Sequence, residues 1–144
     1  MMEQVEFETN VPGNLAAGSE LQKRIVKEME RFSYSTRDVF AIRLAFEEGF
    51  TNAVLHGNEL DESKSVYVSC RINESRIQIQ IRDKGKGFNP DVVPDPTTEV
   101  FIERPTGRGL LLIRAYMSHC EYCDDGRRLI MVRERNSPLP MMDD

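Results

Sequence analysis

The sequence predicts a two-layer α/β sandwich, in which three helices cover one face of a mixed, mostly antiparallel sheet. Apolar residues recur at helical spacing through two long stretches between residues 15 and 56. Two pairs of short alternating segments follow, and each pair is joined by a turn, as in a β-hairpin. Because 144 residues suit one domain, these helices and strands must share one core. Helices segregated from strands then form two layers.

The chain begins with a predicted strand and a predicted helix. Residues 4–8 alternate between polar and apolar and indicate a short strand. A turn follows, and apolar residues at helical spacing predict a helix over 15–32. Either Asn14 or Ser19 could cap this helix, since both side chains can accept a hydrogen bond from a free backbone N–H.

A second helix and a hairpin occupy the middle of the chain. The helix is predicted over 35–56, and Gly57 is expected to end it, because glycine is favoured just past a helix C-terminus. Residues 66–72 and 77–81 each alternate and place their apolar side chains on one face. The turn over 73–75 joins them, so this hairpin is expected to bury one face only.

The second half holds a long irregular stretch, a third helix and a second hairpin. Residues 84–108 contain three glycines and four prolines without periodicity, which is typical of a functional lid or a disordered loop. Residues 109–118 predict the third helix. Strands are predicted over 120–124 and 128–133, joined by Asp125-Gly126, a strong hairpin signature.

Composition indicates a soluble globular protein. The chain is 40% hydrophobic and 30% charged, and its net charge of −5 argues against direct nucleic-acid binding. No stretch is apolar enough for a membrane span and no signal pattern begins the chain, so we expect a cytoplasmic protein. Residues 1–136 form the predicted domain, and 137–144 a disordered tail. Cys70, Cys120 and Cys123 are an odd set and are interpreted as buried reduced thiols.

A row of polar side chains lies on the second predicted helix. Glu48 and Asn52 are four residues apart and therefore project from one face about one turn apart. His56 continues this row. A solvated stripe is the simpler explanation of the row taken alone.

Two glycine-containing segments add to this row. Asp83 ends a strand, where its carboxylate could accept a hydrogen bond from an exocyclic amine such as that of adenine. Gly85 and Gly87 then allow the backbone to approach a ligand closely. Residues 106–109 open the third helix with free N–H groups suited to phosphate. A surface turn and a flexible cap are the simpler explanations of each segment alone, but together the features predict a nucleotide site.

These features occur in the order found in one known superfamily. Residues 46–57 resemble the N-box of GHKL ATPases, 83–87 their first glycine box, and 107–110 their second. The small size is similar to that of the anti-sigma-factor serine/threonine kinases of bacterial partner-switching systems. The resemblance covers roughly residues 3–134 and implies the Bergerat (GHKL) ATP-binding fold.

The resemblance also implies a role for each matched residue. Asn52 would ligate the Mg²⁺ that bridges the phosphates of ATP, Glu48 would be the general base, and Asp83 would bind the adenine amine. Either Arg104 or Arg108 would reach the γ-phosphate. The implied nucleotide contacts also include His56, Gly85, Gly87, Thr106, Gly107, Gly109 and Leu110. The sequence departs from the family where Arg127 and Arg128 follow the hairpin glycine, since a threonine is common there.

The implied function is that of a homodimeric protein kinase. It would phosphorylate a STAS-type anti-anti-sigma protein and thereby hold or release a sigma factor or another switched target. A non-catalytic ATP-binding module that sequesters a partner is the alternative. A histidine kinase fragment is disfavoured, because His56 lies inside the N-box and His119 after the third helix, so neither is the phosphorylated residue of a helical hairpin.

Overall fold

The computed structural model describes residues 3–85 and 112–140. Its helical elements are α1 (Leu15–Arg31), α2 (Thr36–Asn52) and the π-helical turn η1 (Ala53–Gly57). Residues 112–116 are also helical. The strands are β1 (Gln4–Val11), β2 (Val66–Asn73), β3 (Arg76–Arg82), β4 (His119–Cys123) and β5 (Arg128–Glu134).

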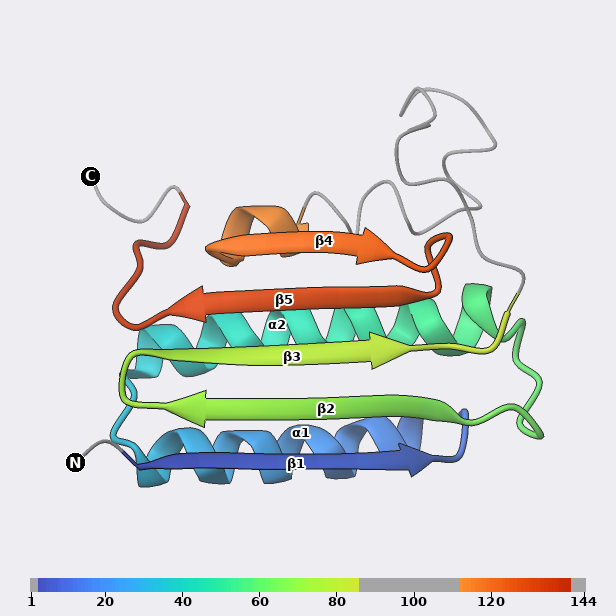
Figure 1. The fold of residues 1–144 in the computed structure, drawn as a ribbon, viewed down its shortest axis with the longest axis horizontal. Helices are drawn as coiled ribbons and strands as arrows, with labels where there is room; N and C mark the ends of the chain where they lie inside the picture. The colour runs from blue at the N-terminus through green and yellow to red at the C-terminus, as the bar shows by residue number, and fades with distance from the viewer. Residues whose placement is uncertain (1–2, 86–111, 141–144) are drawn as a thin grey trace.

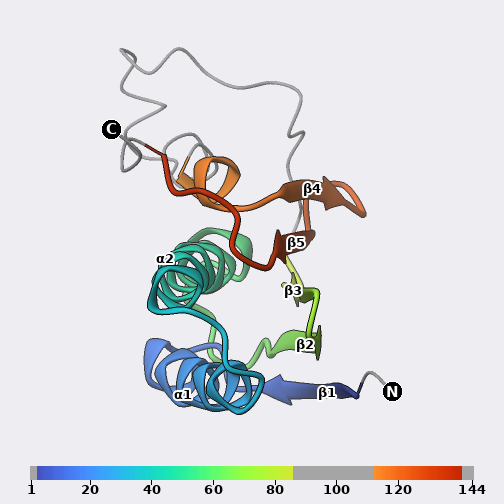
Figure 2. The same cartoon turned by 90° about the vertical axis from the view of Figure 1, so that its left-hand side faces the viewer.

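The strands form one sheet in the order β1-β2-β3-β5-β4 (Figure 1). Figure 2 shows α1, α2 and the 112–116 helix together on one side of this sheet. The predicted two-layer sandwich is therefore confirmed. The sheet is more uniform than the predicted mixed one, because every pairing between the five described strands is antiparallel.

The core lies between the sheet and the helices. Every second residue of the central strands faces the helices, as shown by Ile77, Ile79 and Ile81, which are almost completely buried. Helix α2 packs closely on the sheet at Gly49, where an added Cβ would lie 2.8 Å from a Leu129 methyl carbon. A small residue is required there because the sheet itself occupies the space beside the helix.

The two long helices begin with side-chain caps. Asn14, rather than Ser19, caps α1 and accepts a hydrogen bond from the Ala17 N–H at 2.9 Å. Ser35 caps α2 in the same way through the Asp38 N–H. These bonds satisfy backbone donors that have no partner within the helix.

The C-terminal part of α2 differs from the prediction. The α-helix ends at Asn52 and continues as the π turn η1 rather than running regularly to His56. Gly57 does not adopt the left-handed conformation of a helix-ending glycine. The chain instead leaves η1 through Asn58, whose N–H bonds to the Ala53 carbonyl at 2.8 Å. This widened turn lies beside the candidate site.

A buried ion pair joins the layers at the opposite end of α2. Arg133 of β5 and Asp38 of α2 are almost fully buried, with 2.9 Å between the Arg133 Nε and the Asp38 Oδ1. Arg133 also donates to the carbonyls of Tyr116 and Ser137. Leu139 is buried as well. The first residues of the predicted disordered tail are therefore packed, whereas 141–144 lie outside the described residues.

Candidate functional site

Asn52 carries a buried amide without a well-formed hydrogen bond. It is the last residue of α2 and is 6% exposed, and within the described structure neither Oδ1 nor Nδ2 has a hydrogen-bond partner of ordinary geometry. Leaving a buried polar group unpaired costs about 1–3 kcal/mol. Buried polar groups are nearly always paired, so an orphaned amide requires an explanation. A bound ligand would supply one.

Tyr122 of β4 lies next to this amide and was not predicted from the sequence. Burial raises the pKa of its hydroxyl strongly, the Asp83 carboxylate adds to that shift, and the Asn52 amide partly opposes it. Tyr122 therefore connects Asn52 with Asp83 on the helix-covered side of the sheet. The sequence gave no indication of this contact, because Tyr122 lies far along the chain from both Asn52 and Asp83.

Asp83 follows β3 directly and is 8% exposed. Its N–H donates to the Arg127 carbonyl at 2.9 Å, and its Oδ1 accepts from the Gly85 N–H at 2.8 Å. Burial raises the pKa of the carboxyl, and the Gly85 N–H and Arg127 partly oppose this shift. Among the described residues, no hydrogen bond reaches Oδ2, so this oxygen can accept one from a ligand.

Gly57 and Gly85 hold the π turn against the end of β3. An added Cβ on Gly57 would lie 2.3 Å from the Asp83 Cγ, and one on Gly85 would lie 1.7 Å from the Gly57 carbonyl oxygen. Both positions therefore require glycine for packing within the chain, before any ligand is considered. This contact brings the N-box and the first glycine box together.

Asn58 fastens the same region and was also missed. Its fully buried side chain donates from Nδ2 to the carbonyls of Lys64 and Ser65, and its Oδ1 accepts from the Lys84 N–H at 2.8 Å. Every polar atom of this amide has a partner, unlike the amide of Asn52. Gly57-Asn58 looks like an ordinary helix end in the sequence, which concealed the role of Asn58.

Glu48 and His56 differ in how they relate to Asn52. Glu48 is half-buried and lies one α-helical turn before Asn52 on the same face. His56 follows within the π turn, so the regular four-residue spacing is lost there. Its side chain is exposed overall, although partial burial of the ring lowers its pKa. The structure thus keeps Glu48 and Asn52 in one row and separates His56 from it.

The remaining predicted contacts fall beyond the described ranges. They are Gly87, Arg104, Thr106, Gly107, Arg108, Gly109 and Leu110, together with the predicted lid. The departure from the family at residue 127 can be described. The Arg127 guanidinium pairs with Asp124 and Asp125 at 3.6 and 3.4 Å, and its carbonyl accepts the Asp83 N–H.

The described part of the site fits a magnesium nucleotide. The Asn52 amide oxygen is an unpartnered hard ligand, and Mg²⁺ is usually held by few protein oxygens together with substrate phosphates. The Asp83 Oδ2 is an acceptor for an amine. Over residues 3–85 and 112–140, no group of three or more His, Cys, Asp or Glu side chains could hold a metal without a nucleotide.

Comparisons with known proteins show the family of this chain. The family model of the histidine kinase-like ATPase domain matches residues 11–133. An anti-sigma F factor from Clostridium perfringens is 34% identical over 102 residues, which cover 67% of this chain and 72% of that relative. Another, from Bacillus cytotoxicus, is 35% identical over 83 residues and covers 56% of each chain.

A solved structure shares the fold. It contains the RsbU and RsbW domains of a Mycobacterium tuberculosis protein and superimposes with a TM-score of 0.63 at 14% identity. The match covers 94% of this chain and 34% of the longer one. Within its described residues, this chain has no helix both long and apolar enough to cross a membrane.

Proposed function

Because this chain belongs to the GHKL family of histidine kinase-like ATPases and, within it, to the anti-sigma factor kinases, we propose a catalytic function for it. The proposed activity is that of an ATP-dependent serine/threonine protein kinase. Its substrate is a STAS-type anti-anti-sigma protein, and its switched target is a sigma factor or another regulator. The orphaned Asn52 amide, one turn beyond Glu48, is the observation that supports this proposal most directly.

The chain's own residues divide the work between binding and proton transfer. The Asp83 Oδ2 accepts a hydrogen bond from the adenine amine. Gly57 and Gly85 allow the backbone to pack closely around Asp83. The amide oxygen of Asn52 would hold Mg²⁺, and the metal would supply positive charge to neutralise the phosphates. Glu48 takes the proton from the attacking hydroxyl, a role worth about 10²–10⁴-fold in rate.

Phosphorylation would act on the partner through charge. A phosphate adds about −1.5 to −2 charge at neutral pH and disrupts an interface that has no cation to receive it. The phosphorylated anti-anti-sigma protein would then dissociate, and the kinase would hold its target. In this proposal the kinase acts as a cytoplasmic homodimer. Either Arg104 or Arg108 would contact the γ-phosphate and so distinguish ATP from ADP.

A transfer assay with two neighbouring glutamates tests the proposal. The protein is purified with its STAS-type partner and supplied with Mg-ATP, and phosphate on the partner is measured. Glu48→Gln should lower the transfer rate by about 10²–10⁴-fold and leave ADP affinity unchanged. Glu47→Gln is the matched control, because Glu47 is exposed and lies about 100° away around the helix.

The outcomes separate the kinase from the non-catalytic module. Equal rates for Glu48→Gln and the parent would exclude Glu48 as the base. If the parent binds ADP but transfers no phosphate, the protein is an ATP-binding module that sequesters its partner. If the parent binds neither ADP nor ATP, the proposed nucleotide site is refuted.

A further inference from the structure

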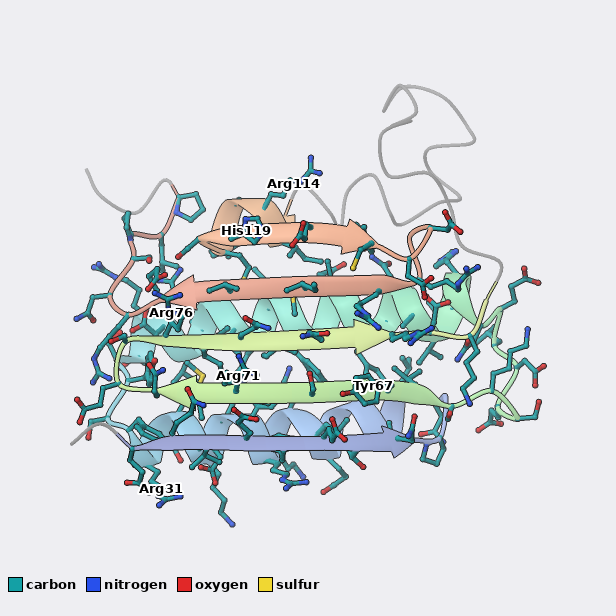
Figure 3. All side chains as sticks on the ribbon, in the orientation of Figure 1. Arg31, Tyr67, Arg71, Arg76, Arg114 and His119 are labelled. Atoms are coloured by element: carbon teal, nitrogen blue, oxygen red, sulfur yellow. The ribbon has the colours of Figure 1, made fainter. Side chains whose placement is uncertain are left out.

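Two arginines face each other on the open side of the sheet. Arg82 of β3 and Arg128 of β5 are direct cross-strand partners. Like charges placed directly opposite one another destabilise a sheet. Arg71 and Arg76 lie on the same open face (Figure 3), where the charges are complementary. Arg76 of β3 pairs with Glu134 of β5 at 3.4 Å, and Arg71 pairs with Glu6 at 3.1 Å. The Arg82–Arg128 pairing therefore requires a compensating interaction.

The described neighbours compensate only one of these two arginines. Arg82 forms an ion pair with Asp124 at 3.0 Å. The Nε of Arg128 is buried and has no hydrogen-bond partner within the described residues. A buried cationic donor without an acceptor is costly, which points to an anion between the two guanidinium groups.

A cleft of about 640 Å³ surrounds this pair. Four cationic side chains and one carboxylate line it, although the whole chain carries a net charge of −5. Two of the cations, Arg82 and Arg127, are paired with Asp124 and Asp125, so Arg128 is the arginine of the facing pair that lacks an ion pair within the described residues. Its lining is Asn10, Tyr67, Gln80, Arg82, Asp83, Lys84, Gly85, Arg127 and Arg128. The volume lies within the range of small-molecule sites. Tyr67, labelled in Figure 3, lies on the open face of β2 at one side of this cleft.

The cleft is distinct from the nucleotide site. Gln80, Arg82 and Arg128 alternate with buried residues and point away from the helices, whereas Asn52 and Tyr122 lie on the helix-covered side. The two sites meet at Asp83 and Gly85, which line the cleft and also belong to the candidate nucleotide site. A ligand held between Arg82 and Arg128 would thus bind on the open face, on the opposite side of the sheet from Asn52.

We propose that this cleft binds a phosphate-bearing anion between Arg82 and Arg128. Guanidinium groups bind phosphate oxygens through two parallel hydrogen bonds, which lysine cannot do. A doubly charged phosphate would neutralise the facing arginines and give the Arg128 Nε its missing acceptor. The phosphate belongs either to a free small molecule or to a phosphorylated side chain of a partner protein.

Calorimetry with saturating ADP and without Mg²⁺ tests the cleft while the nucleotide site is filled. Pyrophosphate and inorganic phosphate are the probes of the free ligand, and a phosphoserine peptide is the probe of the protein-bound one. Arg128→Gln should weaken binding of the preferred probe by about 10- to 100-fold, the effect of one lost charge-assisted contact. Arg76→Gln is the matched control, because Arg76 lies on β3, on the same open face of the sheet, but outside the cleft.

Thermal unfolding supplies a second, independent readout. In phosphate-free buffer, Arg128→Gln should melt at the same temperature as the parent or higher, because it relieves repulsion between like charges. The preferred probe should raise the melting temperature of the parent and leave that of the variant unchanged. A lower melting temperature for the variant without ligand would assign Arg128 a structural role and overturn the proposal.

The calorimetric results decide whether the cleft binds phosphate and which kind of ligand carries it. The proposal is overturned if none of the three probes binds, or if Arg128→Gln and Arg76→Gln bind them equally well. Tighter binding of pyrophosphate or phosphate than of the peptide identifies a free ligand, and the reverse identifies a phosphorylated partner. These outcomes do not depend on phosphoryl transfer, so the kinase proposal can fail while the cleft stands.

Discussion

Each end of α2 buries a polar side chain, but the hydrogen bonding of the two side chains differs. At the first turn, both carboxylate oxygens of Asp38 accept hydrogen bonds, from the Arg133 Nε at 2.9 Å and the Asn136 N–H at 3.0 Å. At the last residue, neither polar atom of the Asn52 amide has a hydrogen bond of ordinary geometry within the described structure, although Tyr122 lies beside it. A satisfied buried group fixes the scaffold, whereas an unsatisfied one is available to a ligand.

The surroundings of the two ends differ in the same way. Arg133 joins α2, β5, the end of the 112–116 helix and the chain after β5 through charge-assisted hydrogen bonds. The Asn52 end instead contains a π turn and glycines in close contact with Asp83. π-Helical turns occur frequently at functional sites. Stability is therefore concentrated at one end and binding capacity at the other.

The largest expected effect comes from breaking the satisfied end. Asp38→Ala would leave the buried Arg133 charge uncompensated and should lower the free energy of unfolding by about 3–5 kcal/mol. Urea unfolding measures this change. Arg76→Gln removes an exposed ion pair and should cost about 0–1 kcal/mol. Similar losses for the two variants would show that the Asp38–Arg133 pair does not anchor this end.

A smaller effect is expected where the π turn meets β3. Gly57→Ala places a Cβ 2.3 Å from the Asp83 Cγ, so the turn must shift. Overpacking of this kind costs about 1–3 kcal/mol, and the displaced carboxylate should also bind ADP less tightly. Urea unfolding and calorimetry with ADP check the two parts. A variant with normal stability and affinity would contradict the role given to this contact.

A substitution at Asn52 should change the free energy of unfolding in the opposite direction to one at Asp38. Asn52→Leu removes an unpaired buried amide and keeps a similar volume, so the free energy of unfolding should stay equal or rise by about 1 kcal/mol. Mg-dependent nucleotide binding should be lost at the same time. Urea unfolding and calorimetry with Mg-ADP measure both quantities. If Asn52→Leu is strongly destabilised, the amide has a structural partner and the contrast between the ends of α2 fails.

The smallest effect concerns pH. Burial raises the pKa of Asp83 above its ordinary value of 3.8, so between these two pKa values the folded state binds more protons than the unfolded state. The contribution of Asp83 to stability therefore falls as pH rises through this window. Asp83→Asn removes that term, and its stability relative to the parent should increase over the same window. Urea unfolding across pH 3.5–7 tests the sign, and a relative decrease would contradict it.

Sequence reasoning succeeded where structure is local. The alternation of residues 66–72 and 77–81 predicts β2 and β3 within a residue or two, because side-chain direction in a strand depends only on the strand itself. The helix caps and the Glu48–Asn52 row are local for the same reason. The nucleotide-site residues stay a prediction, which rests on the order of the motifs rather than on any one of them.

Features that depend on tertiary contact were not predictable in this way. The π turn packs closely against Asp83 through Gly57, and these residues are distant in the chain. Asp38 and Arg133 look like ordinary surface charges, because nothing near either residue indicates a partner 95 positions away. Tyr122 and Asn58 were missed because their importance comes from neighbours contributed by other elements.

The order of strands divides the molecule into two parts that meet at one seam. β1, β2, β3, α1 and α2 all precede residue 86, whereas β4, β5 and the 112–116 helix follow residue 111. The parts join through the β3–β5 ladder and the Asp38–Arg133 pair. A break in the chain between residues 86 and 111 would thus yield two fragments with complementary edges. Such a division is the natural starting point for a split-protein reporter, whose reassembly would rebuild the central seam of the sheet.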